Sequence, residues 1–156
     1  MSIYLVRHVK AGYRSRWKDD DRLRPVSKAG QRQARRLVDV LDGLRTERIL
    51  SSPYVRSIES VAPLASVRGL AIELSEALAE EAPLDDALVL VRKHAHENAV
   101  LCSHGDVIPM LLEYFARRGV DLGPNPQCAK GSTWVLETDA GGEVVAARYF
   151  PPPPEE

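Results

Sequence analysis

Short apolar runs alternate with longer stretches of helical period along most of the chain. The apolar runs predict strands at residues 3–6, 48–51, 70–74 and 99–102. Between them apolar residues recur at helical spacing, which predicts helices that begin near residues 28, 53, 83 and 107. Strands that alternate with helices are typical of βαβ units. The predicted fold class is therefore α/β, a three-layer sandwich in which helices flank a mainly parallel central sheet.

The last two apolar runs are related differently. Residues 133–137 and 143–150 flank Asp139-Ala140-Gly141-Gly142, and strands joined by such a short turn pair antiparallel. We expect a C-terminal hairpin that closes one domain over residues 1–150. Residues 151–156 are prolines followed by glutamates, which predicts a solvated, flexible polyproline II tail.

Capping residues refine two of the helix starts. Ser27 is a favourable N-cap residue directly before the first helix. Ser52 followed by Pro53 predicts a second helix that begins at the proline, because proline at the first helical position loses no hydrogen bond. Pro63 is expected to kink or restart that helix.

The composition is that of an ordinary globular protein. Of 156 residues, 44% are hydrophobic and 28% are charged, and no apolar run approaches the roughly 18 residues that a membrane span needs. The first residues lack the basic and apolar regions of a secretory signal. Cys102 and Cys128 are too few and too far apart for a disulfide framework. We expect a cytoplasmic protein without membrane contact.

Charge is unevenly distributed along the chain. Residues 1–60 hold 14 Lys and Arg against 7 Asp and Glu, whereas residues 61–156 hold 7 against 15. No RNA- or DNA-binding motif accompanies the basic part, and the acidic part would repel a polyanion. Arg32, Arg35 and Arg36 are expected to form a solvated helix face. We therefore expect no nucleic-acid partner.

Reactive side chains follow three of the predicted strands. Arg7 and His8 come after the first strand, Arg56 lies in the first turn after the second, and His104-Gly105 follows the fourth. In a parallel α/β sheet, ligands bind at the carboxyl ends of the strands. Imidazoles, guanidiniums and free helix N–H groups at one edge suit a phosphate or another tetrahedral oxyanion. The residues alone leave structural roles open: Arg7 could pair with an internal carboxylate, and Arg56 could be a solvated helix residue.

Four segments carry a family resemblance. They are Leu5-Val6-Arg7-His8, the run from Leu23 to Ala34, the run from Ser51 to Ser57, and Ser103-His104-Gly105. In this order they resemble the histidine phosphatase superfamily, with the phosphoglycerate mutase-like fold. Within it the chain is most similar to the short phosphohistidine phosphatases of SixA type, and to the phosphatase-like domain attached to some bacterial MutT-type Nudix hydrolases. Val9 departs from the common signature, where Gly or Ala is usual, and is expected to add bulk beside the nucleophile.

The resemblance implies a metal-independent phosphatase without a cofactor. His8 would attack phosphorus through a neutral ring nitrogen and form a covalent phosphohistidine, which water then hydrolyses. Arg7, Arg56 and a protonated His104 would hold the equatorial oxygens, with Gly105 beside them. Substrates would be protein phosphohistidine or a small phosphoester.

A leaving alkoxide also needs a proton. Leu78-Ala79-Glu80 matches the family's Leu-x-Glu motif best, so Glu80 is the preferred donor, while Glu76, Glu81 and Asp106 remain alternatives. Asp106 could equally serve as an N-cap. Lys10 and Ser15, together with Arg14, Arg16 and Trp17, lie in the loop after His8 and are expected to rim the pocket.

Three other functions compete with this interpretation. A phosphoglycerate mutase-like phosphotransferase is disfavoured because only short segments separate Arg56, Glu80 and His104, which leaves little chain for a cap. A metallohydrolase could use Cys102, His104 and Asp106, but Gly105 interrupts the strand that would align them. A phosphate- or phosphoprotein-binding module with degenerate catalysis would retain the fold without turnover.

Overall fold

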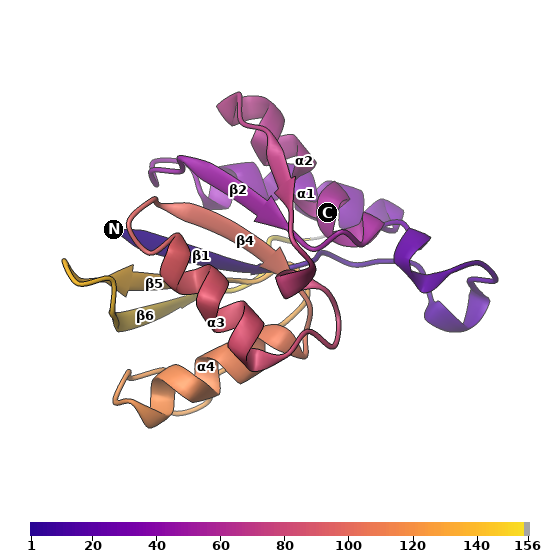
Figure 1. Ribbon diagram of the computed structural model, residues 1–156. Helices are drawn as coiled ribbons and strands as arrows, with labels where there is room; N and C mark the ends of the chain where they lie inside the picture. The colour runs from indigo at the N-terminus through magenta and orange to yellow at the C-terminus, as the bar shows by residue number, and fades with distance from the viewer. Residues whose placement is uncertain (155–156) are drawn as a thin grey trace.

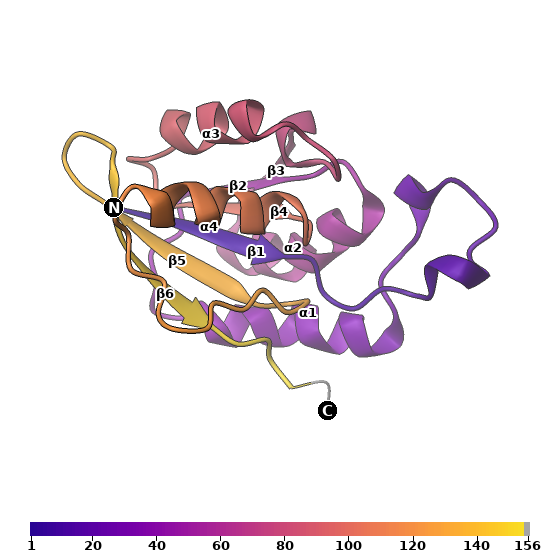
Figure 2. The ribbon, with the colours of Figure 1, turned by 90° about the horizontal axis from the view of Figure 1, so that it is seen from below.

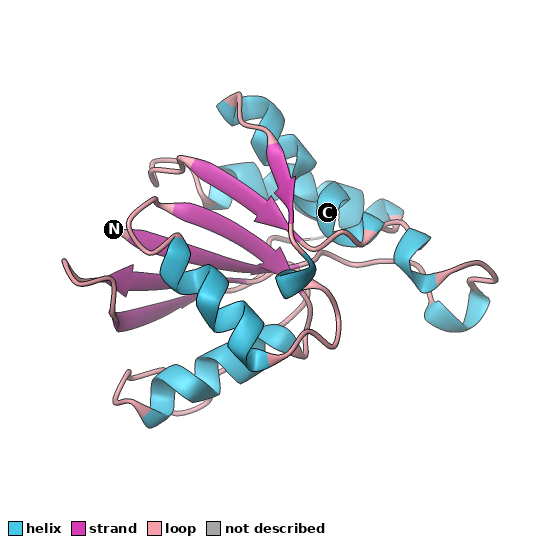
Figure 3. Cartoon of the chain, in the orientation of Figure 1, coloured by secondary structure: helices cyan, strands magenta, loops and turns pink. Residues whose placement is uncertain are grey.

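The computed structural model describes residues 1–154 and contains one six-stranded sheet covered by helices (Figures 1 and 3). The strands are β1 (Ser2–Arg7), β2 (Arg48–Ser51), β3 (Ile72–Leu74), β4 (Ala99–Ser103), β5 (Thr133–Thr138) and β6 (Val144–Phe150). The α-helices are α1 (Lys28–Val40), α2 (Val55–Arg68), α3 (Leu84–Lys93) and α4 (Val107–Arg117). Three short 3-10 turns are η1 (Arg14–Arg16), η2 (Asp21–Leu23) and η3 (Glu76–Leu78).

The strand order is β3-β2-β4-β1-β5-β6. The first four of these are mutually parallel, and β5 and β6 add an antiparallel hairpin at the far edge. The predicted α/β fold class and the predicted C-terminal hairpin are both confirmed. Because β4 is inserted between β2 and β1, the ends of β1 and β4 are neighbours.

Helices cover both faces of the sheet (Figure 2). Alternate residues of β1 serve the two faces: Ile3 and Leu5 pack with α3 and α4, whereas Tyr4 and Val6 pack with α1 and α2. A strand buried on both faces needs this continuous apolarity. Burial of each such aliphatic side chain stabilises the fold by about 1.5–3 kcal/mol, so β1 rigidly supports His8 at its carboxyl end.

Three local predictions need correction. α2 begins at Val55 and not at Pro53, and its N-cap residue is Tyr54 and not Ser52. Pro63 lies inside α2, which continues as one helix to Arg68. The third strand begins at Ile72, two residues later than its apolar run suggests.

Two prolines of the expected solvated tail, Pro153 and Pro154, bind side chains of α1. Pro153 is buried, and its carbonyl oxygen accepts a hydrogen bond from Gln33 Nε2 at 3.3 Å. The Pro154 carbonyl accepts one from Arg36 at 2.7 Å. These carbonyls are free to accept because a polyproline segment makes no internal hydrogen bonds. Residues 155–156 of the expected tail lie outside the described residues. No helix within residues 1–154 combines the length and apolarity needed to cross a bilayer.

Candidate active site

The parallel pairing of β1 with β4 brings the two candidate histidines together. Arg7 is in register with Ser103, so His8 and His104 leave the sheet side by side. The backbone N–H of His8 donates to the Ser103 carbonyl at 3.0 Å. The two rings meet edge to face, with centroids 5.2 Å apart. This confirms that the carboxyl edge of the sheet collects the reactive groups.

His8 is held in one orientation. Its Nδ1 lies 2.8 Å from the Val9 carbonyl oxygen and donates to it, which leaves the lone pair on Nε2. Burial lowers the pKa of His8 to about 3. The Val9 hydrogen bond opposes this shift, and repulsion by nearby cations adds to it. The ring is therefore neutral near pH 7, as a nucleophilic imidazole must be.

His104 is buried between a serine pair and a tyrosine. Its Nε2 lies 2.8 Å from the Ser52 hydroxyl and 3.5 Å from that of Ser57, and the Tyr54 ring packs edge to face at 4.7 Å. Its Nδ1 is buried without a hydrogen-bond partner among residues 1–154. Burial and the charge of Arg56 lower the pKa of His104 to about 4. The protonated form expected from the sequence is therefore absent near pH 7 unless an anion stabilises it.

Arg7 presents its guanidinium beside Gly105. Its Nη1 donates to the Cys128 carbonyl oxygen at 2.6 Å, while its Nε is buried and has no hydrogen-bond partner in the described part of the chain. No carboxylate within residues 1–154 forms an ion pair with it, so the internal partner left open by the sequence is not found. A Cβ atom on Gly105 would lie 2.5 Å from Arg7 Cζ. A side chain at this position would displace the guanidinium, so glycine allows Arg7 to lie here.

Arg56 is held differently from the prediction. Its side chain is 1% exposed and donates to the Asp21 carbonyl oxygen at 2.9 Å and to the Asp21 and Glu80 carboxylates at 3.1 and 3.0 Å. It does not line the cavity around His8. The family resemblance predicts that the Arg56 guanidinium holds phosphoryl oxygens. In the structure it is neutralised by the carboxylates of Asp21 and Glu80 beside His104.

Of the four candidate proton donors, Glu80 and Asp106 line the cavity, and their contacts differ. Both oxygens of Glu80 accept hydrogen bonds from guanidiniums, one from Arg14 and one from Arg56, each at 3.0 Å. Asp106 accepts from the backbone N–H groups of Val107 and Glu81, at 2.8 and 2.6 Å. Asp106 thus has the capping role that the sequence left open. It also lines the cavity, as Glu80 does.

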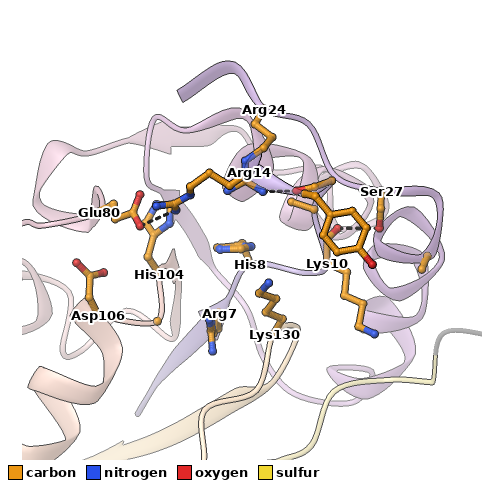
Figure 4. A pocket seen from close by; sticks show the side chains of 15 residues that line it. Arg7, His8, Lys10, Arg14, Arg24, Ser27, Glu80, His104, Asp106 and Lys130 are labelled. Carbon is orange, nitrogen blue, oxygen red and sulfur yellow. Dashed lines mark hydrogen bonds and ion pairs between the residues drawn. The ribbon is translucent and has the colours of Figure 1, made fainter. Parts of the chain in front are cut away.

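A cavity of about 850 Å³ opens around His8 (Figure 4). Its lining includes Arg7, His8, Lys10, Arg14, Arg24, Glu80, His104, Gly105, Asp106 and Lys130. Lys10 and Arg14 thus lie at the rim, as expected. Ser15 is exposed in η1 and lines no part of this cavity, because the 3-10 turn directs Arg14 inward in its place.

Three participants were missed by sequence reasoning. Asp21 binds Arg56 and Arg24, Arg24 is 6% exposed yet lines the cavity, and Lys130 reaches it from the loop before β5. Arg24 lies inside one of the segments that carry the family resemblance, so a signal existed for it. Lys130 lies in a turn-rich loop, and nothing in its sequence context marks it.

The loop after His8 is fixed by close packing. Gly30 lets α1 approach Lys10, since a Cβ atom there would lie 1.9 Å from the Lys10 carbonyl oxygen. Gln33 accepts from the Lys10 N–H at 3.1 Å. Val9 is fully buried against Val26, so its extra bulk points into the core and does not narrow the cavity.

The side chains proposed for a metal site do not converge. Cys102 is fully buried on β4, and burial raises the pKa of its thiol to about 12. Asp106 directs its oxygens to backbone N–H groups. No cluster of three potential metal ligands occurs within the described residues. This donor arrangement does not fit a Cys-His-Asp centre.

Comparison with known sequences agrees with this geometry. The model of the histidine phosphatase superfamily (branch 1) matches residues 3–83. The 8-oxo-(d)GTP phosphatase of Mycolicibacterium smegmatis is 37% identical over 161 residues, which cover 99% of this chain and 49% of that protein. The chain therefore spans about half the length of this curated relative.

Solved structures share the fold at low sequence identity. The protein histidine phosphatase SixA complexed with tungstate superposes with a TM-score of 0.78 and 17% identity, covering 99% of this chain and 97% of that chain. A putative SixA from Agrobacterium tumefaciens gives 0.71 at 21% identity, covering 96% of each chain. A mycobacterial glucosyl-3-phosphoglycerate phosphatase with inorganic phosphate gives 0.68 at 16% identity, covering 96% of this chain and 95% of that chain. With the family model matching more than half of its residues, the chain belongs to the histidine phosphatase superfamily, branch 1.

Proposed function

We propose that the protein is a metal-independent phosphatase that forms a covalent phosphohistidine on His8. The observation that carries this proposal is the fixed, neutral His8 ring, whose Nδ1 is used by Val9 and whose Nε2 remains available in a cavity lined by cations. A nucleophile needs such a lone pair at the operating pH. The cations compensate the charge of a phosphoryl group.

The reaction has two displacement steps. In the first, His8 Nε2 forms a bond to phosphorus as the bond from phosphorus to the leaving atom breaks. The leaving atom is oxygen in a phosphoester and a ring nitrogen in phosphohistidine, and it takes a proton where its basicity requires one. In the second, water attacks phosphorus, the Nε2–P bond breaks and phosphate is released. Arg7 and the Nδ1 side of His104 are the proposed donors for the phosphoryl oxygens, because both residues line the cavity and each has a buried nitrogen without a partner in residues 1–154.

Glu80 is the proposed proton donor for substrates with a basic leaving group. To act, it must take up a proton and release at least one of the two guanidiniums that it binds. This requirement favours leaving groups of low basicity, which need little protonation. Phosphohistidine has such a leaving group, and a nucleotide substrate is supported by the relative whose name is 8-oxo-(d)GTP phosphatase.

The proposal is tested by trapping the intermediate. Wild-type protein is mixed with radiolabelled acetyl phosphate and quenched in acid or in base, beside His8→Ala and a control, His96→Asn, which changes an exposed histidine outside the cavity. We expect an acid-labile, base-stable label on the wild type and the control and none on His8→Ala. Equal labelling of His8→Ala, or none on the wild type, would refute the mechanism.

A further inference from the structure

The cavity is larger and more cationic than one phosphoryl group requires. Its volume of about 850 Å³ lies within the range of about 300–1,000 Å³ typical of pockets for whole small molecules. Five cationic side chains line it against two carboxylates, and they are Arg7, Lys10, Arg14, Arg24 and Lys130 against Glu80 and Asp106. The composition of the lining therefore indicates a substrate with more than one negative group.

The two carboxylates that line the cavity, Glu80 and Asp106, lie on one side of it (Figure 4). Glu80 pairs with Arg14 at 3.0 Å, and Asp21, behind the lining, pairs with Arg24 at 2.9 Å. Figure 4 shows Glu80, Asp106 and His104 to the left of His8, with Lys130 below His8 and beside Arg7.

Lys130 is the cation with the least compensation. None of the ion pairs or hydrogen bonds formed by side chains of residues 1–154 involves its ammonium group. Burial lowers its pKa, and the surrounding charges of Arg7, Arg24, Lys10 and Arg56 lower it further. A lysine placed among four cations is stabilised when an anion binds between them.

We propose that Lys130, together with Arg24 and Lys10, forms a second phosphoryl subsite, and that the preferred substrates are phosphoanhydrides such as nucleoside diphosphates. The terminal phosphoryl group would lie at His8 and the penultimate group at Lys130. This inference rests on the proposed function and narrows its substrate class.

The chemistry of an anhydride suits this site. His8 Nε2 bonds to the terminal phosphorus while the anhydride P–O bond breaks, and the electron pair stays on the bridging oxygen of the departing phosphomonoester. That leaving group is weakly basic and takes no proton from the enzyme. Its added negative charge is compensated by Lys130, so Glu80 can remain paired with Arg14 and Arg56 throughout.

A neighbouring groove offers room for the organic part of such a substrate. A second cavity of about 370 Å³ shares Gly12, Tyr13 and Arg24 with the first, and it is continued by Trp17 and Pro25. Tyr13 is 72% exposed and Arg16 lies over its ring at 5.1 Å, so a substrate ring would stack on the face that Arg16 leaves uncovered. A group linked to the penultimate phosphoryl would enter this groove past Arg24.

The test compares substrates that differ by one phosphoryl group. The values of kcat/KM for GDP and GMP are measured with the wild type, Lys130→Gln and Arg117→Gln. Arg117 is exposed and pairs with Glu113 on α4, so its variant makes the same charge change outside the cavity. We expect the GDP/GMP ratio to fall at least about 10-fold in Lys130→Gln and to be unchanged in Arg117→Gln. Imidodiphosphate should likewise inhibit the wild type more strongly than phosphate does, and Lys130→Gln should lose this difference.

The outcomes separate this inference from the proposed function. A ratio that is equal in Lys130→Gln and the wild type would overturn the second subsite, as would equal inhibition of the wild type by imidodiphosphate and phosphate. If His8 is labelled by acetyl phosphate while either result is obtained, only the diphosphate preference fails. If no phosphoenzyme forms, the proposed function itself fails.

Discussion

The Ser52 hydroxyl oxygen lies 2.8 Å from Nε2 of His104, and both residues are buried. The same oxygen accepts the Tyr54 N–H at 3.2 Å. We expect the Ser52 hydroxyl to donate its hydrogen to Nε2. The hydrogen of the neutral imidazole would then lie on Nδ1, the nitrogen without a hydrogen-bond partner among residues 1–154. His104 can then donate to a phosphoryl oxygen without being protonated.

Replacing Ser52 with alanine should therefore weaken this donor. We expect kcat/KM for p-nitrophenyl phosphate to fall about 10- to 100-fold in Ser52→Ala, less than the roughly 10²- to 10³-fold expected for loss of a direct donor. Nitrogen NMR of the imidazole should show Nδ1–H in the wild type and a tautomer mixture in the variant. Ser57→Ala, which removes a hydroxyl 3.5 Å away, should have a smaller effect. An Nε2–H tautomer in the wild type would contradict the assignment.

The two buried histidines should make stability depend on pH. Their folded-state pKa values, about 3 for His8 and about 4 for His104, lie below the unfolded value of about 6.5. The unfolded state thus binds more protons between those values, and stability is lost as pH falls from about 7 toward 4. Each histidine should contribute a loss of about 2 kcal/mol between pH 7 and pH 5. The free energy of unfolding, measured with urea at several pH values, should fall less steeply between pH 7 and pH 5 in His8→Asn/His104→Asn than in the wild type. An identical pH dependence would refute the lowered pKa values of the two histidines.

Alanine substitutions at the two close-packed glycines, Gly30 and Gly105, should differ in their effects on stability and activity. In Gly30→Ala the new Cβ meets the Lys10 backbone carbonyl, which cannot move without displacing the loop, so unfolding free energy should fall by about 3 kcal/mol or more. In Gly105→Ala the Cβ meets only the end of the flexible Arg7 side chain. Stability should then change by less than about 1 kcal/mol while kcat/KM falls about 10²- to 10³-fold. Thermal unfolding and phosphatase assays on both variants check this, and a reversed pattern would contradict it.

Glu80 and Asp106 can be separated by the choice of leaving group. Glu80→Gln should lower kcat for glycerol phosphate about 10²-fold or more, because an alkoxide needs a proton, and should lower kcat for p-nitrophenyl phosphate far less. Asp106→Asn loses one of two backbone hydrogen bonds, so it should cost about 1 kcal/mol of stability with no dependence on the leaving group. If the loss of kcat depends on the leaving group in Asp106→Asn and not in Glu80→Gln, the proton donor is Asp106.

Sequence periodicity predicts much of this fold for a physical reason. β1 and β4 are buried on both faces, so their apolar runs are continuous, and His8 and His104 follow them directly. That the two strands are neighbours does not follow from periodicity, because strand order depends on packing between distant segments. The family resemblance predicts only that His8 and His104 act on the same phosphoryl group.

The contacts of Arg56 and Lys130 could not be predicted in the same way. Arg56 has the expected position, but Asp21 and Glu80 reach it from two irregular segments whose paths depend on their own ion pairs. Lys130 precedes a glycine with positive φ before β5, and the direction of that loop depends on tertiary contacts. Side chains on loops thus account for most of what sequence reasoning missed.

Gln33 connects the C-terminal prolines to the catalytic loop. Its Oε1 accepts the Lys10 N–H, and its Nε2 donates to the Pro153 carbonyl. One amide thus binds both segments, and rotating it by 180° would lose both hydrogen bonds. A polypeptide joined to the C-terminal prolines therefore begins close to this amide. Met1, in contrast, precedes the end of β1 that lies away from His8. For biochemical work, an affinity tag or fusion partner therefore belongs at the N-terminus, where it leaves the Gln33 contacts untouched.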